Sequence, residues 1–142
     1  MNDYNKMVSK NAPKTKMLPT MLLAFIVGGI ICMIGEGFFD LYKTYFTNLT
    51  EVELRNATSM TMIFIGVTLT AFGLYDKIGY YAGAGSIIPI TGFANSVMSP
   101  AMEYNREGIV YGICCKIFAV AGPIIVFGVT SSVIIGLVGL AL

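Results

Sequence analysis

Long apolar stretches alternate with short polar segments along this chain, and most charged residues lie in the polar segments. Residues 17–39 and 57–75 are each long enough to cross a bilayer as a helix, which needs about 20 predominantly apolar residues. The segment between them, residues 40–56, has tyrosines near its start and charges near its end, a pattern typical of an exposed loop beside an interfacial aromatic belt. We therefore predict two transmembrane helices joined by an outer loop.

The last apolar stretch, residues 109–142, is interrupted only by Lys116 and by the pair Gly122-Pro123. As one α-helix it would be about 51 Å long at about 1.5 Å per residue, longer than a hydrocarbon core of about 30 Å. Because proline inside a helix removes a backbone donor, we expect a break or a kink at Gly122-Pro123.

Residues 78–102 are poorly suited to a continuous lipid-facing helix, because glycine, proline and hydroxyl or amide side chains recur along them. Backbone groups freed by such breaks must be satisfied by protein or by water, so the segment belongs inside a bundle or along a wet cavity. Many channels and transporters hold their solute on broken helices or re-entrant loops. The predicted solute-path residues are Gly83, Gly85, Ser86, Pro89, Thr91, Gly92, Asn95 and Ser96.

Two topologies remain open for this segment, since a kinked ordinary span is the alternative to a re-entrant one. If residues 78–102 span the bilayer, the chain crosses four times and both ends are cytoplasmic. If they re-enter, the chain crosses three times and the C-terminus is outside. In both cases the predicted fold is an all-α integral membrane protein, a compact bundle of three to four transmembrane helices with one broken or re-entrant helical segment.

Residues 1–16 form a polar tail with four lysines and one acidic residue. An excess of lysine beside the first span predicts a cytoplasmic N-terminus, and these lysines can also contact anionic lipid headgroups. The following apolar stretch is too long for a signal-peptide core, so we expect it to be retained. Residues 17–142 then form a single transmembrane domain.

Each predicted span has one face of small residues, on which a neighbouring helix can approach closely. Helix packing explains most of these residues, while a conducting path is the more specific interpretation. The predicted packing residues are Gly28, Cys32, Gly66, Gly73, Gly128 and Gly136.

Ionisable residues at membrane depth are stronger indications of a functional site. Lys116 is the eighth residue of the last apolar stretch, where it either has a function or extends its amine to the interface. Glu36 lies near the outer end of the first span, where an acid can reach the headgroups. The candidate charged sites are Lys116, Glu36, Asp76 and Arg106.

The composition limits the chemistry further. Hydrophobic residues make up 56% of the chain and charged residues 12%, whereas a soluble domain carries about 25% charged residues. A net charge of +1 excludes a strongly basic nucleic-acid-binding protein. The chain has no histidine, the commonest participant in catalytic triads and a frequent metal ligand, and its three cysteines lie in apolar segments, where we expect them to pack. We predict no catalytic activity, no metal site and no cofactor.

Two motifs make the sequence similar to a known family, together with shorter matches at 28–32 and 126–128. They are G-L-Y-D-K-I-G at 73–79 and A-G-A-G-S-I-I-P-I-T-G-F-A-N-S at 82–96. From about Met17 onwards, the chain closely resembles the stage V sporulation protein AC/AE family. In that family glutamine commonly stands where this chain has Glu36, so the position can serve by hydrogen bonding as well as by charge.

The resemblance implies an inner-membrane protein of the forespore and spore of an endospore-forming bacterium. It implies a subunit of a channel or transporter that moves dipicolinic acid, with calcium, into the developing spore and out during germination. A mechanosensitive-channel activity is attributed to the AC type. The implied partners are membrane lipid, other AC-, AD- and AE-type subunits in a homo- or hetero-oligomer, and the calcium chelate of dipicolinate as solute. A non-conducting assembly or gating subunit of the same complex is the alternative.

Overall fold

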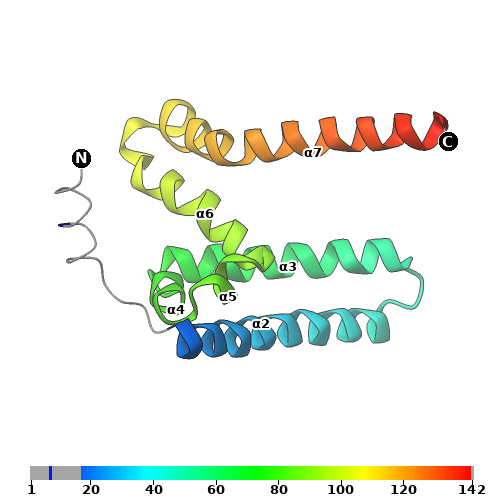
Figure 1. The fold of residues 1–142 in the computed structure, drawn as a ribbon, viewed down its shortest axis with the longest axis horizontal. Coiled ribbons are helices and arrows are strands. Elements are labelled where there is room, and N and C mark those ends of the chain that lie inside the picture. Colours follow the sequence, from blue (N-terminus) through cyan, green and yellow to red (C-terminus); the bar gives the residue numbers. More distant parts are fainter. Residues whose placement is uncertain (1–6, 8–16, 142) are drawn as a thin grey trace.

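The computed structural model of this protein describes Met7 and residues 17–141, and the regular structure in this part of the chain is entirely helical. Figure 1 shows two long antiparallel helices side by side, a group of short helices packed against them, and a last long helix set apart. In chain order the elements are α2 (Met17–Tyr45), α3 (Glu51–Ala71), α4 (Tyr75–Ala82), α5 (Ala84–Ile87), α6 (Ile90–Glu103), the 3₁₀ turn η1 (Asn105–Glu107), the π-helical turn η2 (Ile109–Cys114) and α7 (Cys115–Ala141). The predicted all-helical class is confirmed.

The outer loop is much shorter than the predicted 40–56, because helices extend into it from both sides. Helix α3 begins early at a capping box: the Thr50 N–H donates to the Glu53 carboxylate at 2.8 Å, and the Glu53 N–H donates to Thr50 Oγ1 at 3.4 Å. These reciprocal bonds satisfy backbone donors that the first turn of a helix otherwise leaves free. The T-x-x-E pattern was present in the sequence and marks this start.

Helix α3 ends at Ala71, whereas the predicted second span continued to residue 75. The Gly73 N–H donates to the Thr70 carbonyl at 2.9 Å, and the Leu74 N–H donates to the Leu69 carbonyl at 2.9 Å, the two bonds of a Schellman motif. Gly73 has a φ of 64°, a left-handed conformation that glycine adopts without a Cβ penalty. Helix α4 then departs at 100° from α3.

The segment from α4 to α6 enters the helix pair and returns to the end from which it started. In Figure 1, α4 begins where α2 also begins, α5 lies farther along α2, and α6 leads back to that same end, where η1 and η2 connect to α7. Helix α7 then points in the same direction as α2 in this view. This path matches the re-entrant alternative, because α4 to α6 do not cross from one end of the long helices to the other. We call α4 to α6 the re-entrant hairpin.

Helix α7 runs through Pro123 without ending, so the chain is not broken at Gly122-Pro123. A kink at this pair, the other form of that expectation, stays a prediction. One proline removes one helix donor, and the other backbone groups keep the intrahelical partners that a lipid environment requires. The irregular backbone lies earlier, in η2. Gly108, immediately before η2, has a φ of 94°, and the Ile113 N–H donates to the Gly108 carbonyl at 3.2 Å, five residues back.

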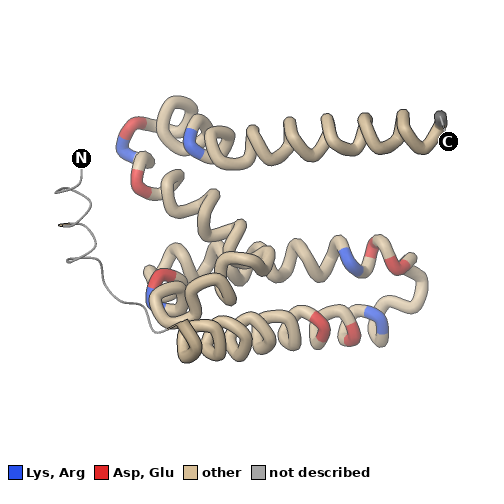
Figure 2. The backbone as a smooth tube through the Cα atoms, in the orientation of Figure 1, with Lys and Arg blue, Asp and Glu red and all other residues tan. Residues whose placement is uncertain are grey.

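Two described helices, α2 and the η2–α7 stretch Ile109–Leu140, are long and apolar enough to cross a membrane. The bent pair of α3 and α4 raises the number to as many as three. Figure 2 shows the charged residues of the described chain gathered at two opposite ends, with a charge-free band between them. This separation is what a bilayer requires, because the core disfavours unpaired charge.

Candidate functional site

The buried centre of the protein is the turn between α5 and α6 rather than a cluster of large apolar side chains. Ser86 is 1% exposed and Thr91 4% exposed, and both lie next to the break at Pro89. The Tyr75 hydroxyl is hydrogen-bonded to the Ser86 carbonyl at 2.7 Å and to Thr91 Oγ1 at 2.8 Å. Tyr75 therefore satisfies a carbonyl near the helix break and joins the start of the hairpin to its tip.

Glycines bring the hairpin into direct backbone contact with its surroundings. A Cβ on Gly85 would overlap the carbonyl oxygen of Ala24 in α2, and a Cβ on Gly92 would overlap the carbonyl oxygen of Ser86. Gly28 of α2 faces Gly85 from the other side, since a Cβ there would lie 3.3 Å from the Gly85 oxygen. Gly85 and Gly92 therefore have no room for a side chain, and Gly28 has little.

The other arm of the hairpin, α6, packs on α3. A Cβ on Gly66 would lie 3.0 Å from the Thr91 carbonyl oxygen, so the two helices approach closely at this point. Thr70 Oγ1 donates a hydrogen bond to Asn95 Oδ1 at 2.8 Å across the same contact. Small residues and one interhelical hydrogen bond thus fix α6 against α3, as is common between membrane helices.

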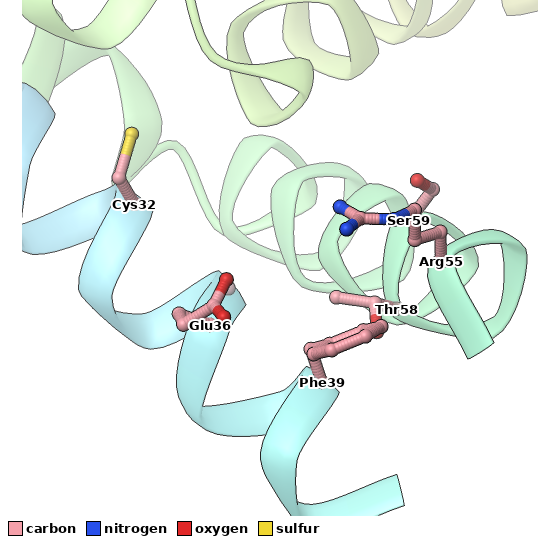
Figure 3. Close-up of a pocket in the computed structure, with 7 residues that line it drawn as sticks. Cys32, Glu36, Phe39, Arg55, Thr58 and Ser59 are labelled. Carbon is pink, nitrogen blue, oxygen red and sulfur yellow. The ribbon is translucent and has the colours of Figure 1, made fainter. Parts of the chain in front are cut away.

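A groove runs between α2 and α3 from the tip of the hairpin toward the outer loop. It consists of two adjoining cavities of about 360 and 230 Å³ that share Cys32, Gly35, Thr58 and Ser59. The larger cavity also has Glu36, Phe39 and Arg55 in its lining, and Figure 3 shows these side chains coming from the two facing helices. The smaller cavity adds Ile31, Met62, Pro89 and Ile90. We call these two cavities the inter-helix groove.

Pro89 and Ile90 place the beginning of α6 at the inner end of this groove. Cys32, which shares that cavity, is about 22 Å along α2 from Met17 at about 1.5 Å per residue, near the middle of the helix. Helix α6 begins there without a side-chain hydrogen bond to cap it. The Gly92 and Phe93 N–H groups donate to the Pro89 carbonyl at 2.8 and 3.4 Å. The N–H groups of Ile90 and Thr91 are therefore the ones that remain, and the partial positive charge at a helix start favours an anion.

The structure divides the predicted solute-path residues into two groups. Gly85, Ser86, Thr91 and Gly92 are buried in the packing of the hairpin, whereas Gly83 and Asn95 are half-buried and Ser96 is exposed. Of the eight, only Pro89 lines the inter-helix groove. Gly83 has a φ of 51° and caps α4, so its role in the described structure is to turn the chain.

The candidate charged residues do not converge. Glu36 lines the inter-helix groove, whereas the ammonium of Lys116 lies 3.6 Å from the ring centroid of Tyr104, a cation–π contact beside the connector to α7. Asp76 lies in the first turn of α4 and Arg106 in η1, both exposed at the end where the hairpin begins and returns. Lys116 is thus held close to the connector rather than placed deep among the helices.

The predicted packing residues also differ among themselves. Gly28 and Gly66 make close helix contacts, as described above, and Gly73 ends α3 instead of packing. Cys32 is exposed toward the groove. A Cβ on Gly128 or Gly136 would have no atom within 4 Å, apart from its own helix and chain neighbours. The second half of α7 therefore has no packing partner within the described chain.

Sequence reasoning missed Tyr75, Arg55, Thr58 and Ser59. Tyr75 was placed at the end of a span, where an interfacial aromatic is ordinary, and only the 100° bend turns it inward. Arg55 was assigned to an exposed loop, but the capping box at Thr50 places it inside α3, facing α2. That T-x-x-E pattern could have shown it. The described residues contain no group of three or more Cys, Asp or Glu side chains that could hold a metal ion.

Comparison with known sequences places this arrangement in a family. The sequence model of the SpoVAC/SpoVAEB sporulation membrane protein family matches residues 20–138. This chain belongs to that family. It is also 44% identical over 139 residues to stage V sporulation protein AC of Bacillus subtilis (strain 168), an alignment that covers 98% of this chain and 92% of that protein.

No solved structure matches the chain. The match to the SpoVAC/SpoVAEB family covers α2 from residue 20 onwards, α3 to α6 entirely and most of α7, so the re-entrant hairpin and the inter-helix groove both lie inside the family region. The chain is accordingly a multi-pass sporulation membrane protein.

Proposed function

We propose that this chain is a membrane subunit of a channel or transporter that moves dipicolinic acid, with calcium, into the developing spore and out during germination. The observation that carries the proposal is the uncapped start of α6, which opens on the inter-helix groove near the middle of α2. Dipicolinate is a flat dicarboxylate, and a helix N-terminus at membrane depth favours such an anion. The family resemblance in the 82–96 motif, which contains this tip, supports the same solute.

The topology follows from the same proposal. Helices α2, α3 and α7 cross the bilayer, and the re-entrant hairpin enters from the side on which α2 begins. Lysines in the N-terminal tail favour a cytoplasmic location for that side, which places the C-terminus outside. The membrane is the inner membrane of the forespore and spore, the partners are lipid and AC-, AD- and AE-type subunits, and the chain catalyses no reaction.

Cys32 offers a direct test, because its thiol is exposed and the residue lines both cavities of the groove. The full-length chain carrying Cys114→Ser and Cys115→Ser, reconstituted in liposomes with its sister subunits, has Cys32 as its one thiol. A bulky methanethiosulfonate reagent should then reduce dipicolinate flux, followed by the luminescence of trapped terbium. The matched control adds Cys32→Ser and should be unaffected by the reagent. Complete labelling of Cys32 with unchanged flux would contradict a solute path through the groove.

A second function, a non-conducting assembly subunit, is favoured by one observation. From Pro123 to Leu140 every residue of α7 is exposed, and Gly128 and Gly136 have open space where a neighbour could approach. Widening Gly136 to Val should then abolish co-purification of sister subunits while flux through those subunits persists. Widening Gly28 is not a clean probe, because Gly28 packs on Gly85 within this chain.

A further inference from the structure

Two side chains of opposite charge line the inter-helix groove. The family resemblance assigns this pair no role in binding the solute. Glu36 of α2 and Arg55 of α3 both line the 360 Å³ cavity. The other cavities described for this protein have no charged residue in their lining. The charged side chains that line the groove therefore both lie in this cavity.

Arg55 is oriented for recognition across the groove. Its guanidinium lies 5.1 Å from the ring centroid of Phe39 on α2, although Glu51, one helical turn earlier, is the residue with which an arginine ordinarily pairs along a helix. Stacking on an aromatic face holds the guanidinium plane and leaves its edge N–H donors free. Two parallel donors of this kind match the two oxygens of a carboxylate.

Hydroxyl groups and the opposing acid complete the lining. Thr58 and Ser59 of α3 line both cavities of the groove, and Figure 3 shows them on the same helix as Arg55. Glu36 reaches the same cavity from the facing helix. A bare dianion would be attracted by Arg55 and repelled by Glu36, whereas a dianion that carries a bound divalent cation experiences less repulsion.

We propose that Arg55 binds one carboxylate of the solute at the outer end of the groove, and that Glu36 makes this site select the cation-chelated dicarboxylate over the free dianion. This selectivity site rests on the proposed function, since it takes dipicolinate as its solute. The selectivity site adds two things to the proposed function: the residues that recognise the solute, and the form of the solute that they recognise.

Equilibrium binding tests the assignment of Arg55. The full-length chain in nanodiscs of zwitterionic lipid is dialysed against dipicolinate with and without calcium. Arg55→Gln should raise the Kd at least about tenfold, the usual loss when a charge-assisted hydrogen bond is removed, and Arg55→Lys should lose less. Lys43→Gln, in the last turn of α2 and outside the lining of the groove, is the matched control and should bind like the wild type. Unchanged melting of each variant shows that folding is intact.

The role of Glu36 has its own measurement. Glu36→Gln keeps the size of the side chain and removes its charge, so it should strengthen binding of free dipicolinate about two- to fivefold and change binding of the calcium chelate little. The preference of the site for the chelate then falls. An unchanged ratio of the two affinities would overturn the selective role of Glu36.

Three outcomes separate this inference from the proposed function. If the wild type binds and transports dipicolinate and Arg55→Gln does so equally well, the selectivity site is wrong and the proposed function stands. If the wild type with its sister subunits neither binds nor transports dipicolinate, the proposed function itself fails. The third outcome concerns nanodiscs that also contain anionic lipid, in which Arg55→Gln reduces only the amount of anionic lipid bound to the protein and leaves dipicolinate binding unchanged. In that case Arg55 anchors a lipid phosphate and the inference is overturned.

Discussion

The re-entrant hairpin and the second half of α7 are both rich in glycine, yet glycine has opposite surroundings in them. In the hairpin, Gly85 and Gly92 face backbone oxygens so closely that a Cβ would overlap them. In α7, Gly128 and Gly136 face open space. The contrast teaches that a small residue in a membrane helix shows where close approach is possible, and only the fold shows whether the chain itself uses that approach.

Polar side chains repeat the contrast. Ser86 and Thr91 are buried. The Ser86 hydroxyl donates to the Gly83 carbonyl, and the Thr91 hydroxyl is hydrogen-bonded to Tyr75. Thr130 in α7, by contrast, donates only to the carbonyl of Val126 in its own helix, at 2.7 Å. The polar side chains of the hairpin therefore form their hydrogen bonds within this chain's own fold. The second half of α7 remains available to lipid or to another subunit.

The largest expected effect comes from adding a Cβ at a glycine that has no free space, in comparison with the same change at a glycine that faces open space. Gly85→Ala should lower the free energy of unfolding by about 3 kcal/mol, because its Cβ meets a backbone carbonyl that no rotamer change can move. Gly136→Ala should leave the stability unchanged or raise it by up to about 1 kcal/mol through helix propensity. Unfolding in mixed micelles, followed by circular dichroism, measures both. Equal effects of the two substitutions would remove the distinction between the regions.

A smaller effect is expected at the hydroxyl that closes the hairpin. Tyr75→Phe should cost about 2 kcal/mol, since the Ser86 carbonyl and the Thr91 hydroxyl lose a buried partner. Tyr80→Phe is the matched control, because Tyr80 is 84% exposed, and it should leave the stability unchanged. The same unfolding assay decides the comparison. A stability of Tyr75→Phe equal to that of the wild type would show that the hydroxyl does not hold the hairpin.

The smallest effect concerns the hydrogen bond between α3 and α6. A double-mutant cycle of Thr70→Val and Asn95→Ala should give a coupling energy of about 0.6 kcal/mol, the average for interhelical hydrogen bonds in membranes. As a reference, a cycle of Thr130→Val with Asn95→Ala should give none, since Thr130 bonds only within α7. A coupling near zero in the first cycle would show that small-residue packing alone fixes α6.

Some local features were readable from particular residues. Glycine and proline indicated that 78–102 is not one continuous helix, and the structure interrupts it at Gly83 and at Pro89, where their backbone chemistry acts locally. The capping box at Thr50 was equally local and was overlooked, so the outer loop was predicted too long. Pro123 shows the limit of such reasoning, since the apolar run around it keeps α7 helical through the expected break.

The sequence by itself determined that this is a helical membrane protein with one broken segment, because apolar length and helix-breaking residues act through solvent and backbone alone. Its motifs also determined the family. Only the tertiary structure decided that the broken segment returns to its starting end, that Tyr75 turns inward to join the start of this segment to its tip, and that Arg55 and Glu36 share a groove. These features depend on the 100° bend after α3 and on which helices meet, and both are settled by contacts between residues far apart in the chain.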